Sequence, residues 1–408
     1  MTPLYDPARH EPLAGAPWSE DAARAEIARI AASARDEFDA ARGNWPMHPR
    51  DDPPTPQTRH ADLYFGATGV FWALRDLASQ GVIEPMLDPR PWLAQLAPRA
   101  RAAVAHEAHG TASYLAGECG AMLLHWSVTR EPAVADALHA LIRGNLHNPC
   151  REPLWGNSGT LLAAIHLAEA SGEVRWMRLV QDGVRVLLDT MEIDPDVGTW
   201  TWVQDLYGRR IRYLGAGHGL VGNVYPALRG AALLDDVTVQ TLVERARQTL
   251  ERCALRDGEL INWHPFTDAE DLARAQAKGK LPPVQDCHGA PGIVCRLAGA
   301  PRSPEWDALL LAAGELTWVA GPLAKGASLC HGTGNSAMTM LKLFRRNGDE
   351  RWLDRARQLA MHMIVQVERH RAEHRRGRHT LWTGDLGAAC VLWNCIIGDD
   401  RFPTLDHF

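Results

Sequence analysis

Three short strings in the second half of the chain place a histidine or a cysteine at a glycine turn. They read GAGHGLVG at 215–222, QDCHGAPG at 285–292 and LCHGTGN at 329–335. Two thiolates and an imidazole are ligands that a catalytic zinc ion uses while a fourth position stays open for a substrate. The strings therefore indicate metal or proton-transfer chemistry, provided that the turns meet. The side chains concerned are His218, Cys287, Cys330 and His331.

The spacing of these residues leaves two interpretations open. Cys287 and Cys330 are 43 residues apart, unlike the compact cysteine pairs of structural zinc motifs. The adjacent Cys330 and His331 can both bind a metal only if a turn presents their side chains on the same side. The alternative is a buried thiol beside a hydrogen-bonded imidazole.

Glycine pairs recur along the chain and divide it into repeats, on average 53 residues apart between Gly66 and Gly384. This length is sufficient for two helices and their connections. Apolar stretches such as 160–170 follow the glycines, and amphipathic stretches such as 239–256 separate them. We therefore predict helical hairpins whose buried and solvated helices alternate, with the glycine turns on one rim. The pairs are Gly66/Gly69, Gly117/Gly120, Gly156/Gly159, Gly219/Gly222, Gly289/Gly292, Gly332/Gly334 and Gly384/Gly387.

Composition excludes several classes of protein. The 408 residues are 46% hydrophobic and have a formal net charge of −6, so the basic excess of a nucleic-acid-binding protein is missing. Apolar runs end well before the roughly 20 residues that span a bilayer, and the start of the chain does not resemble a signal peptide. We therefore expect a cytoplasmic protein without a membrane span. We also expect residues 1–59 to be an N-terminal extension that packs on a single domain formed by 60–408.

The eight cysteines do not suggest a disulfide framework, because such frameworks belong to small secreted domains. Reduced thiols are therefore available for chemistry. Six of them have no ligand-like neighbour and are expected to be small core or surface side chains. These six are Cys119, Cys150, Cys253, Cys295, Cys390 and Cys395.

The strings GAGHGLVG, VQDCHGAPG, KGASLCHGTGN and LWTGDLGAA occur in this order among seven glycine turns and resemble the lanthionine synthetase C-like family. This family comprises the cyclases that make thioether rings in lantibiotic peptides and stand-alone relatives, including eukaryotic glutathione-binding proteins. The likeness runs from about residue 60 to residue 397, and we expect a stand-alone member. It implies an all-α fold, a toroid (α/α barrel) of seven inner and seven outer helices, in agreement with the repeat count.

The resemblance also implies roles for individual residues. Carried onto this chain, the metal ligands of the family fall on Cys287, Cys330 and His331, which would bind Zn²⁺. The histidine of the fourth turn falls on His218, the best available acid or base. His288 is expected not to be a ligand.

Three further residues are candidates through the same resemblance. Glu152, four residues before Gly156, corresponds to the acidic residue of the third family unit and is expected to have an orienting or proton-exchanging role. Lys325 is expected to contact a carboxylate of a small thiol. Arg378 is expected to bind an anionic group near the rim.

The implied function is zinc-dependent activation of a thiol, glutathione or cysteine, for addition to a dehydroamino acid or a similar electrophile. The partners would be a small thiol such as glutathione, a dehydrated peptide or protein, or both. Pro283 and Asp286 stand where the cyclases commonly have arginine and tryptophan, which weakens the case for ring closure on a peptide. One alternative is a glutathione- or peptide-binding regulatory protein that keeps the zinc site without turnover. Another is a carbohydrate-active α/α-barrel enzyme, although no convincing pair of acidic residues supports it.

Overall fold

The computed structural model describes residues 3–408, so that residues 1–2 of the predicted N-terminal extension lie outside it. Within this range the chain forms fifteen α-helices, three short 3-10 helices and six strands of two or three residues. The predicted all-α class is therefore confirmed.

Seven helices begin directly after the seven predicted glycine turns. In each of them the first glycine of the pair is the N-cap residue, and most of the residues of the helix are buried, as predicted for inner helices. They are α2 (Ala67–Ser79), α4 (Glu118–Thr129), α6 (Asn157–Ser171), α8 (Leu220–Arg229), α11 (Ala290–Leu297), α13 (Thr333–Asn347) and α15 (Asp385–Ile397).

Two of these turns require glycine for a steric reason. Gly219 has φ of 134°, and a Cβ atom there would lie 2.2 Å from the carbonyl oxygen of Tyr213. Gly289 has φ of 107°, and its Cβ would lie 2.0 Å from the carbonyl oxygen of Pro283. Only glycine, which has no Cβ atom, can adopt such a backbone conformation at such a short distance from a carbonyl oxygen. The glycines therefore fix the geometry of the turns that carry His218 and Cys287.

A second set of seven helices alternates with the first along the chain. These helices are amphipathic; in α9, for example, Leu242, Ala246 and Leu250 are buried on one face. α10 (Ala269–Ala277) is an additional short helix. The alternating set consists of α1 (Glu20–Asp36), α3 (Leu93–Ala103), α5 (Pro132–Asn145), α7 (Val174–Thr190), α9 (Asp236–Cys253), α12 (Pro304–Ala320) and α14 (Glu350–His374).

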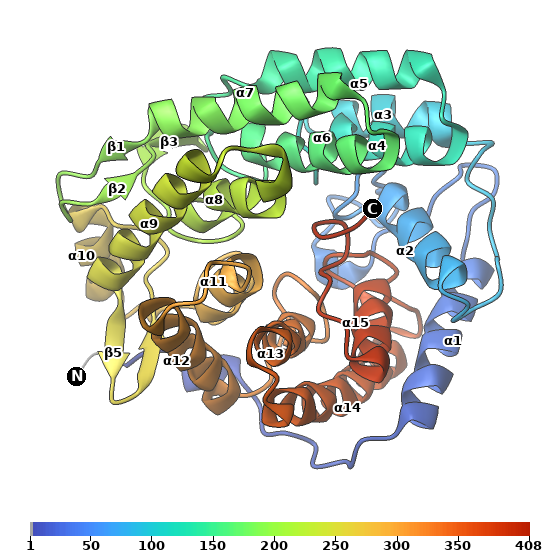
Figure 1. The fold of residues 1–408 in the computed structure, drawn as a ribbon. Helices are drawn as coiled ribbons and strands as arrows, with labels where there is room; N and C mark the ends of the chain where they lie inside the picture. Colours follow the sequence, from blue (N-terminus) through green and yellow to red (C-terminus); the bar gives the residue numbers. More distant parts are fainter. Residues whose placement is uncertain (1–2) are drawn as a thin grey trace. The chain divides into compact units, whose positions relative to one another are not determined.

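The chain divides into two compact units. The first holds His139–Ala320 with two short stretches that end at Ala8 and Tyr114. In it, α6 packs against α7, α8 against α9, and α11 against α12 (Figure 1). In the second unit, α13 packs against α14, and α1 packs against α15. The second unit holds Arg9–Thr111, Leu115–Leu138 and Gly321–Phe408. The predicted domain boundary after residue 59 stays a prediction.

The described strands form three antiparallel hairpins, all within the first unit. They are β1 (Glu192–Ile193) with β2 (Trp200–Thr201), β3 (Gln204–Leu206) with β4 (Arg209–Ile211), and β5 (Leu255–Asp257) with β6 (Leu260–Asn262). Leu206 pairs with Arg209, so the β3–β4 loop consists of Tyr207 and Gly208 alone. The 3-10 helices are Pro7–Arg9, Pro49–Asp51 and Ala231–Leu233.

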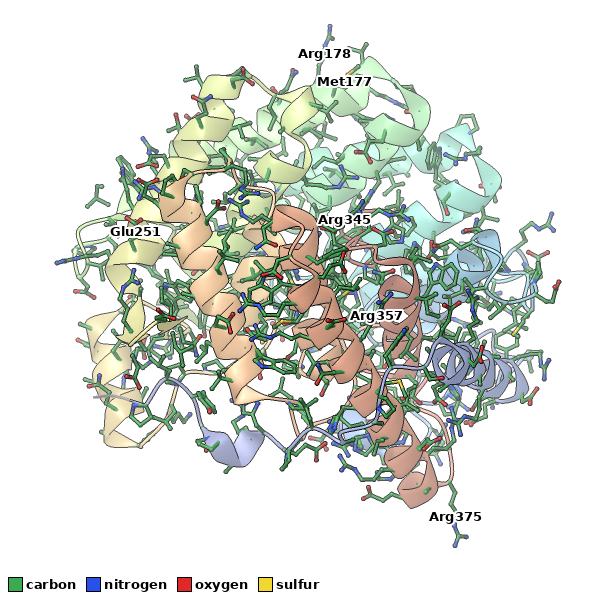
Figure 2. All side chains as sticks on the ribbon, turned by 60° about the horizontal axis from the view of Figure 1, so that its bottom comes forward. Met177, Arg178, Glu251, Arg345, Arg357 and Arg375 are labelled. Carbon is green, nitrogen blue, oxygen red and sulfur yellow. The ribbon has the colours of Figure 1, made fainter. Side chains whose placement is uncertain are left out.

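Charged side chains are exposed at several positions of the amphipathic helices. Arg178 of α7 and Arg375, directly after α14, are exposed and extend away from the ribbon (Figure 2). Across residues 3–408, no helix combines the length and the apolar character that crossing a bilayer would demand.

Candidate functional site

The turn before α8 lies against the turn that carries Cys287. The backbone N–H of Gly217 donates to the carbonyl oxygen of Cys287 at 3.1 Å. A Cβ atom at position 217 would lie only 2.6 Å from the Cβ atom of Cys287. The glycine before His218 thus allows two turns that are distant in sequence to pack backbone to backbone.

His218 and Glu152, both predicted as catalytic residues, contact each other directly. The Nδ1 atom of His218 lies 2.8 Å from Oε2 of Glu152. The Glu152 carboxylate is fully buried, and it also accepts hydrogen bonds from the backbone N–H groups of Leu154, at 3.0 Å, and Trp155. An ionised carboxylate only accepts hydrogen bonds, so Nδ1 of His218 carries the shared proton and Nε2 is left for a substrate.

The surroundings of His218 favour its protonated form. Burial alone lowers the pKa of His218, but the hydrogen bond to Glu152 and the charges of Glu152 and Cys287 raise it, and the pKa lies above its usual value. A histidine in this state remains protonated closer to neutral pH and can donate a proton to a substrate.

Cys287 is buried in the first unit and has a hydrogen-bond donor at its sulfur. The side-chain Nε2 of Gln285 donates to Sγ of Cys287 at 2.9 Å. A donor in this position stabilises a thiolate, the form in which cysteine binds a metal. Sequence reasoning missed Gln285, because a single glutamine two residues before a cysteine carries no motif.

Cys330 and His331 lie together in the second unit. Sγ of Cys330 is 3.5 Å from Nε2 of His331, and the backbone N–H of Cys330 donates to the carbonyl oxygen of Trp382 at 3.0 Å. Two atoms bound to a tetrahedral zinc ion at about 2.0–2.3 Å are themselves about 3.5 Å apart. The turn thus presents both side chains on one side, with a separation that suits two ligands of one ion.

Among the residues that the structure describes, Cys287, Cys330 and His331 make up a group that could hold a metal ion. Among the described residues, the eight cysteines are thiols and form no disulfide bond. Other thiols have environments that suppress reactivity: burial raises the pKa of Cys253 and of Cys395 to about 12. Burial also raises the pKa values of Cys119 and Cys390.

Lys325 and Arg378, the two predicted substrate-binding residues, both lie in the second unit. Lys325 is exposed, and its carbonyl oxygen accepts a hydrogen bond from Arg50 at 2.7 Å. Arg378 is buried, and its guanidinium donates to Oδ1 of Asp51, at 3.0 Å from Nε. The guanidinium of Arg378 is therefore paired with a carboxylate of the protein itself.

Aromatic rings lie close to His218, and no spacing pattern in the sequence pointed to them. The ring of Tyr213 lies 5.9 Å from that of His218, and the ring of His288 lies 5.6 Å from it in a stacked arrangement. Tyr207 approaches His218 edge to face at 6.1 Å. These contacts fix the plane of the imidazole.

Asp286, which departs from the cyclase pattern, forms a buried ion pair. Its Oδ2 atom lies 2.8 Å from a guanidinium nitrogen of Arg296, and both side chains are almost fully buried. Removal of one partner would leave the other charge uncompensated. Asp286 thus ties the turn that carries Cys287 to α11.

The sequence of the chain is similar to those of a known protein family and of individual proteins. A family model described as "Lanthionine synthetase C-like protein" matches residues 57–406. LanC-like protein GCL1 of Arabidopsis thaliana is 28% identical over 47% of this chain and 43% of the relative. Glutathione S-transferase LANCL1 of Danio rerio is 30% identical over 50% of this chain and 49% of the relative. The chain thus spans about half the length of the curated relatives that it matches.

A solved structure has the same fold. Nisin cyclase aligns with a TM-score of 0.62 at 14% sequence identity, over 85% of this chain and 92% of the other. This likeness, together with the seven glycine-capped helices and their seven alternating partners, confirms the predicted α/α-barrel fold class.

Proposed function

Because the chain belongs to the lanthionine synthetase C-like family, we propose that it is a zinc-dependent enzyme that adds a thiol to an electrophilic double bond and forms a thioether. The observation that carries this proposal is the combination of a Cys-Cys-His group with the His218–Glu152 pair. The first supplies ligands for a metal that binds sulfur, and the second supplies a proton donor.

The residues present fit zinc. Two cysteines and one histidine form a donor set of a catalytic zinc site, which leaves a fourth position for a substrate. Both sulfur atoms belong to buried cysteines, and Gln285 donates to one of them. When bound, zinc lowers the pKa of an incoming thiol, so that the thiol is a thiolate near neutral pH.

The proposed reaction balances without an oxidant or a reductant. The thiolate sulfur forms a bond to the β-carbon of the acceptor, and the electron pair of the double bond moves to the adjacent carbonyl oxygen as an enolate. Nε2–H of His218 then donates a proton to the α-carbon. The proton released by the thiol goes to solvent, from which His218 regains its own. The net change is addition of S–H across a carbon–carbon double bond.

In this proposal Glu152 is a positioning residue. Its buried carboxylate accepts hydrogen bonds from Nδ1 of His218 and from two backbone N–H groups, so Nδ1 is held at the carboxylate and Nε2 is left for a substrate. Burial lowers the pKa of His218, but the hydrogen bond to Glu152 and its charge raise this pKa above its usual value, which favours the protonated imidazole.

We propose that the thiol is glutathione or a cysteine of a peptide. One relative of this chain is named a glutathione S-transferase. Lys325, which is exposed, would contact a carboxylate of the thiol, and Arg378 would contribute positive charge to an anionic group. A cytoplasmic location fits eight cysteines that form no disulfide among the described residues, since disulfides are rare where glutathione keeps thiols reduced.

The test is addition of glutathione to N-acetyl-dehydroalanine methylamide, followed by mass spectrometry of the adduct. We expect the wild type to accelerate the addition and His218→Ala to reduce the rate about a hundredfold or more, as for the loss of a general acid. His60→Ala is the matched control, because His60 is also paired with a buried carboxylate, Asp62, at 3.2 Å. If wild type binds glutathione but does not accelerate addition, the enzyme proposal is wrong and the regulatory alternative stands.

A further inference from the structure

Tyr207 occupies the tip of the β3–β4 hairpin in a conformation that tyrosine seldom adopts. Its φ is 53°, and that of Gly208 is 74°. A two-residue hairpin loop with two positive φ angles strongly prefers Asn-Gly or Asp-Gly, because these residues tolerate the left-handed region. Tyr207 as a whole residue is also 56% exposed. Neither local conformation nor burial explains a tyrosine here, and strained residues of this kind cluster at binding sites.

Hydrogen bonds connect Tyr207 to the proposed proton donor. The indole Nε1–H of Trp155 donates to the hydroxyl oxygen of Tyr207 at 3.0 Å. The backbone N–H of Trp155 donates to Glu152, which in turn receives Nδ1–H of His218. The Tyr207 ring centre lies 6.1 Å from that of His218, with 72° between the planes. The exposed Tyr207, the half-buried Trp155 and the proton donor therefore have a fixed mutual orientation.

The base of the hairpin is held firmly, so the tip does not depend on a substrate for its position. Arg209 forms an ion pair with Asp271 of α10. The backbone N–H of Arg212 donates to Asp268 at 2.7 Å, and its guanidinium donates to Glu192 at 2.8 Å. A preorganised aromatic surface binds without a large loss of conformational entropy.

We propose that Trp155 and Tyr207 form an aromatic shelf that binds a flat apolar substituent of the acceptor and thereby selects acceptors that carry one. The shelf would hold the double bond so that its α-carbon faces Nε2 of His218. This inference rests on the proposed function and names its acceptor class: an α,β-unsaturated carbonyl compound with an aromatic or similarly flat neighbour. Tyr207 and Trp155 are then specificity-determining residues.

The test compares two acceptors that share one electrophile. N-acetyl-dehydroalanine benzylamide carries an aromatic ring, and N-acetyl-dehydroalanine methylamide does not. We expect wild type to have a KM for the benzylamide about three- to tenfold below that for the methylamide, as a ring stacked on aromatic side chains would provide. Equal KM values for the two acceptors would overturn the proposal.

Tyr207→Asn separates binding from folding. Asparagine suits the left-handed conformation better than tyrosine, so the variant should unfold at the same temperature as wild type or a higher one. Its KM for the benzylamide should rise to the KM that the same variant has for the methylamide, so that the preference is lost. Val237→Ala, at another exposed apolar residue of the same unit, is the control and should keep the preference. If Tyr207→Asn keeps it too, the shelf does not select the acceptor.

A binding measurement distinguishes failure of this inference from failure of the proposed function. N-acetylalanine benzylamide lacks the α,β carbon–carbon double bond of the acceptor and cannot add a thiol. If wild type forms no thioether but binds this compound in calorimetry, and Tyr207→Asn binds it several-fold more weakly, the proposed function is wrong and the shelf stands. If wild type forms the thioether but Tyr207→Asn binds the compound as tightly as wild type does, the shelf is wrong and the proposed function stands.

Discussion

At the residue scale, the sulfur atoms of this chain have two kinds of surroundings. Cys287 has the amide of Gln285 at its sulfur, and Cys330 has the imidazole of His331 near its own. Burial raises the pKa values of three other thiols, those of Cys119, Cys390 and Cys395. A side-chain amide and an imidazole therefore distinguish the surroundings of Cys287 and Cys330 from those of these three thiols.

We predict that the purified protein contains about one zinc ion per chain and that Cys330→Ala lowers the zinc content to near zero. Loss of one thiolate removes one of three proposed protein ligands, and a site that keeps two ligands binds zinc far more weakly. Elemental analysis after dialysis measures the content. Cys253→Ala removes a thiol that is not in the candidate group and should leave the zinc content unchanged; equal zinc loss in both variants would contradict the assignment.

A second prediction concerns the pH dependence of the proposed addition. Although burial lowers the pKa of His218, Glu152 and Cys287 raise it above the usual value. If the protonated imidazole is the proton donor, the rate falls as the pH rises through this pKa. Glu152→Gln removes the main source of the upward shift, so the fall should begin at a lower pH. Rate profiles of both proteins between pH 5 and pH 9, a window of about two units on each side of neutral, measure the shift.

The control for this prediction is a similar pair in the second unit. Asp62 precedes Gly66 by four residues, as Glu152 precedes Gly156, and although burial lowers the pKa of His60, Asp62 raises it above its usual value. Each raised pKa stabilises the folded state fully below about pH 6.5 and loses that effect as the pH rises through the folded-state pKa. Asp62→Asn should therefore lower the stability of the folded state at low pH, as Glu152→Gln does. It should not change how the addition rate depends on pH. An identical shift of the profile in both variants would refute a specific role for Glu152.

The candidate residues were predictable to different degrees. Histidine and cysteine at the glycine turns stand out because few residue types bind zinc or transfer protons near neutral pH. The resemblance pointed to Glu152, and the structure adds that its carboxylate meets Nδ1 of His218. Gln285, Trp155 and Tyr207 could not be found in the same way, because amides and aromatic rings serve many structural purposes and gain a role only from their neighbours.

At the element scale, glycine determines where the inner helices begin. A Cβ atom at position 289 would lie 2.0 Å from the carbonyl oxygen of Pro283, in a backbone with φ of 107°. We predict that Gly289→Ala lowers the free energy of unfolding by about 3 kcal/mol, since strain and overpacking add. Denaturant unfolding measures the loss.

Gly144 offers the matched control for this substitution. It lies in α5, and no atom is within 4 Å of a Cβ built there. Gly144→Ala should raise the stability by about 0.5–1 kcal/mol, because alanine has the smaller entropy loss in a helix. A similar loss in both variants would show that the close contact at position 289 is not decisive.

The helices were easier to predict than the hairpins. Paired glycines followed by apolar residues identify the inner helices because a helix can begin in a tight turn only where no Cβ obstructs the backbone. The β3–β4 hairpin gave no such signal, since its loop is Tyr207–Gly208 rather than Asn-Gly. Strands of two or three residues are also too short for an alternating pattern to emerge.

At the scale of the whole molecule, a metal bound by residues distant in sequence would contribute to stability. We predict that a zinc chelator lowers the thermal unfolding temperature of wild type and that added zinc restores it, because a ligand that binds the folded state alone stabilises it by mass action. Differential scanning calorimetry measures the shift. Without chelator, Cys330→Ala should already unfold at the lower temperature, and the chelator should not lower its unfolding temperature further. A decrease equal to that of wild type would contradict zinc binding at this residue.

One position recurs in all seven glycine turns: the residue directly before the N-cap glycine. In order along the chain it is Phe65, Ala116, Trp155, His218, His288, His331 and Thr383. The backbone of the turn depends on the glycine and the following helix, whereas the preceding side chain differs from turn to turn. The scaffold is therefore modular in its chemistry, and Ala116 and Thr383 are natural positions at which protein engineers can introduce a new acid, base or ligand by a single substitution.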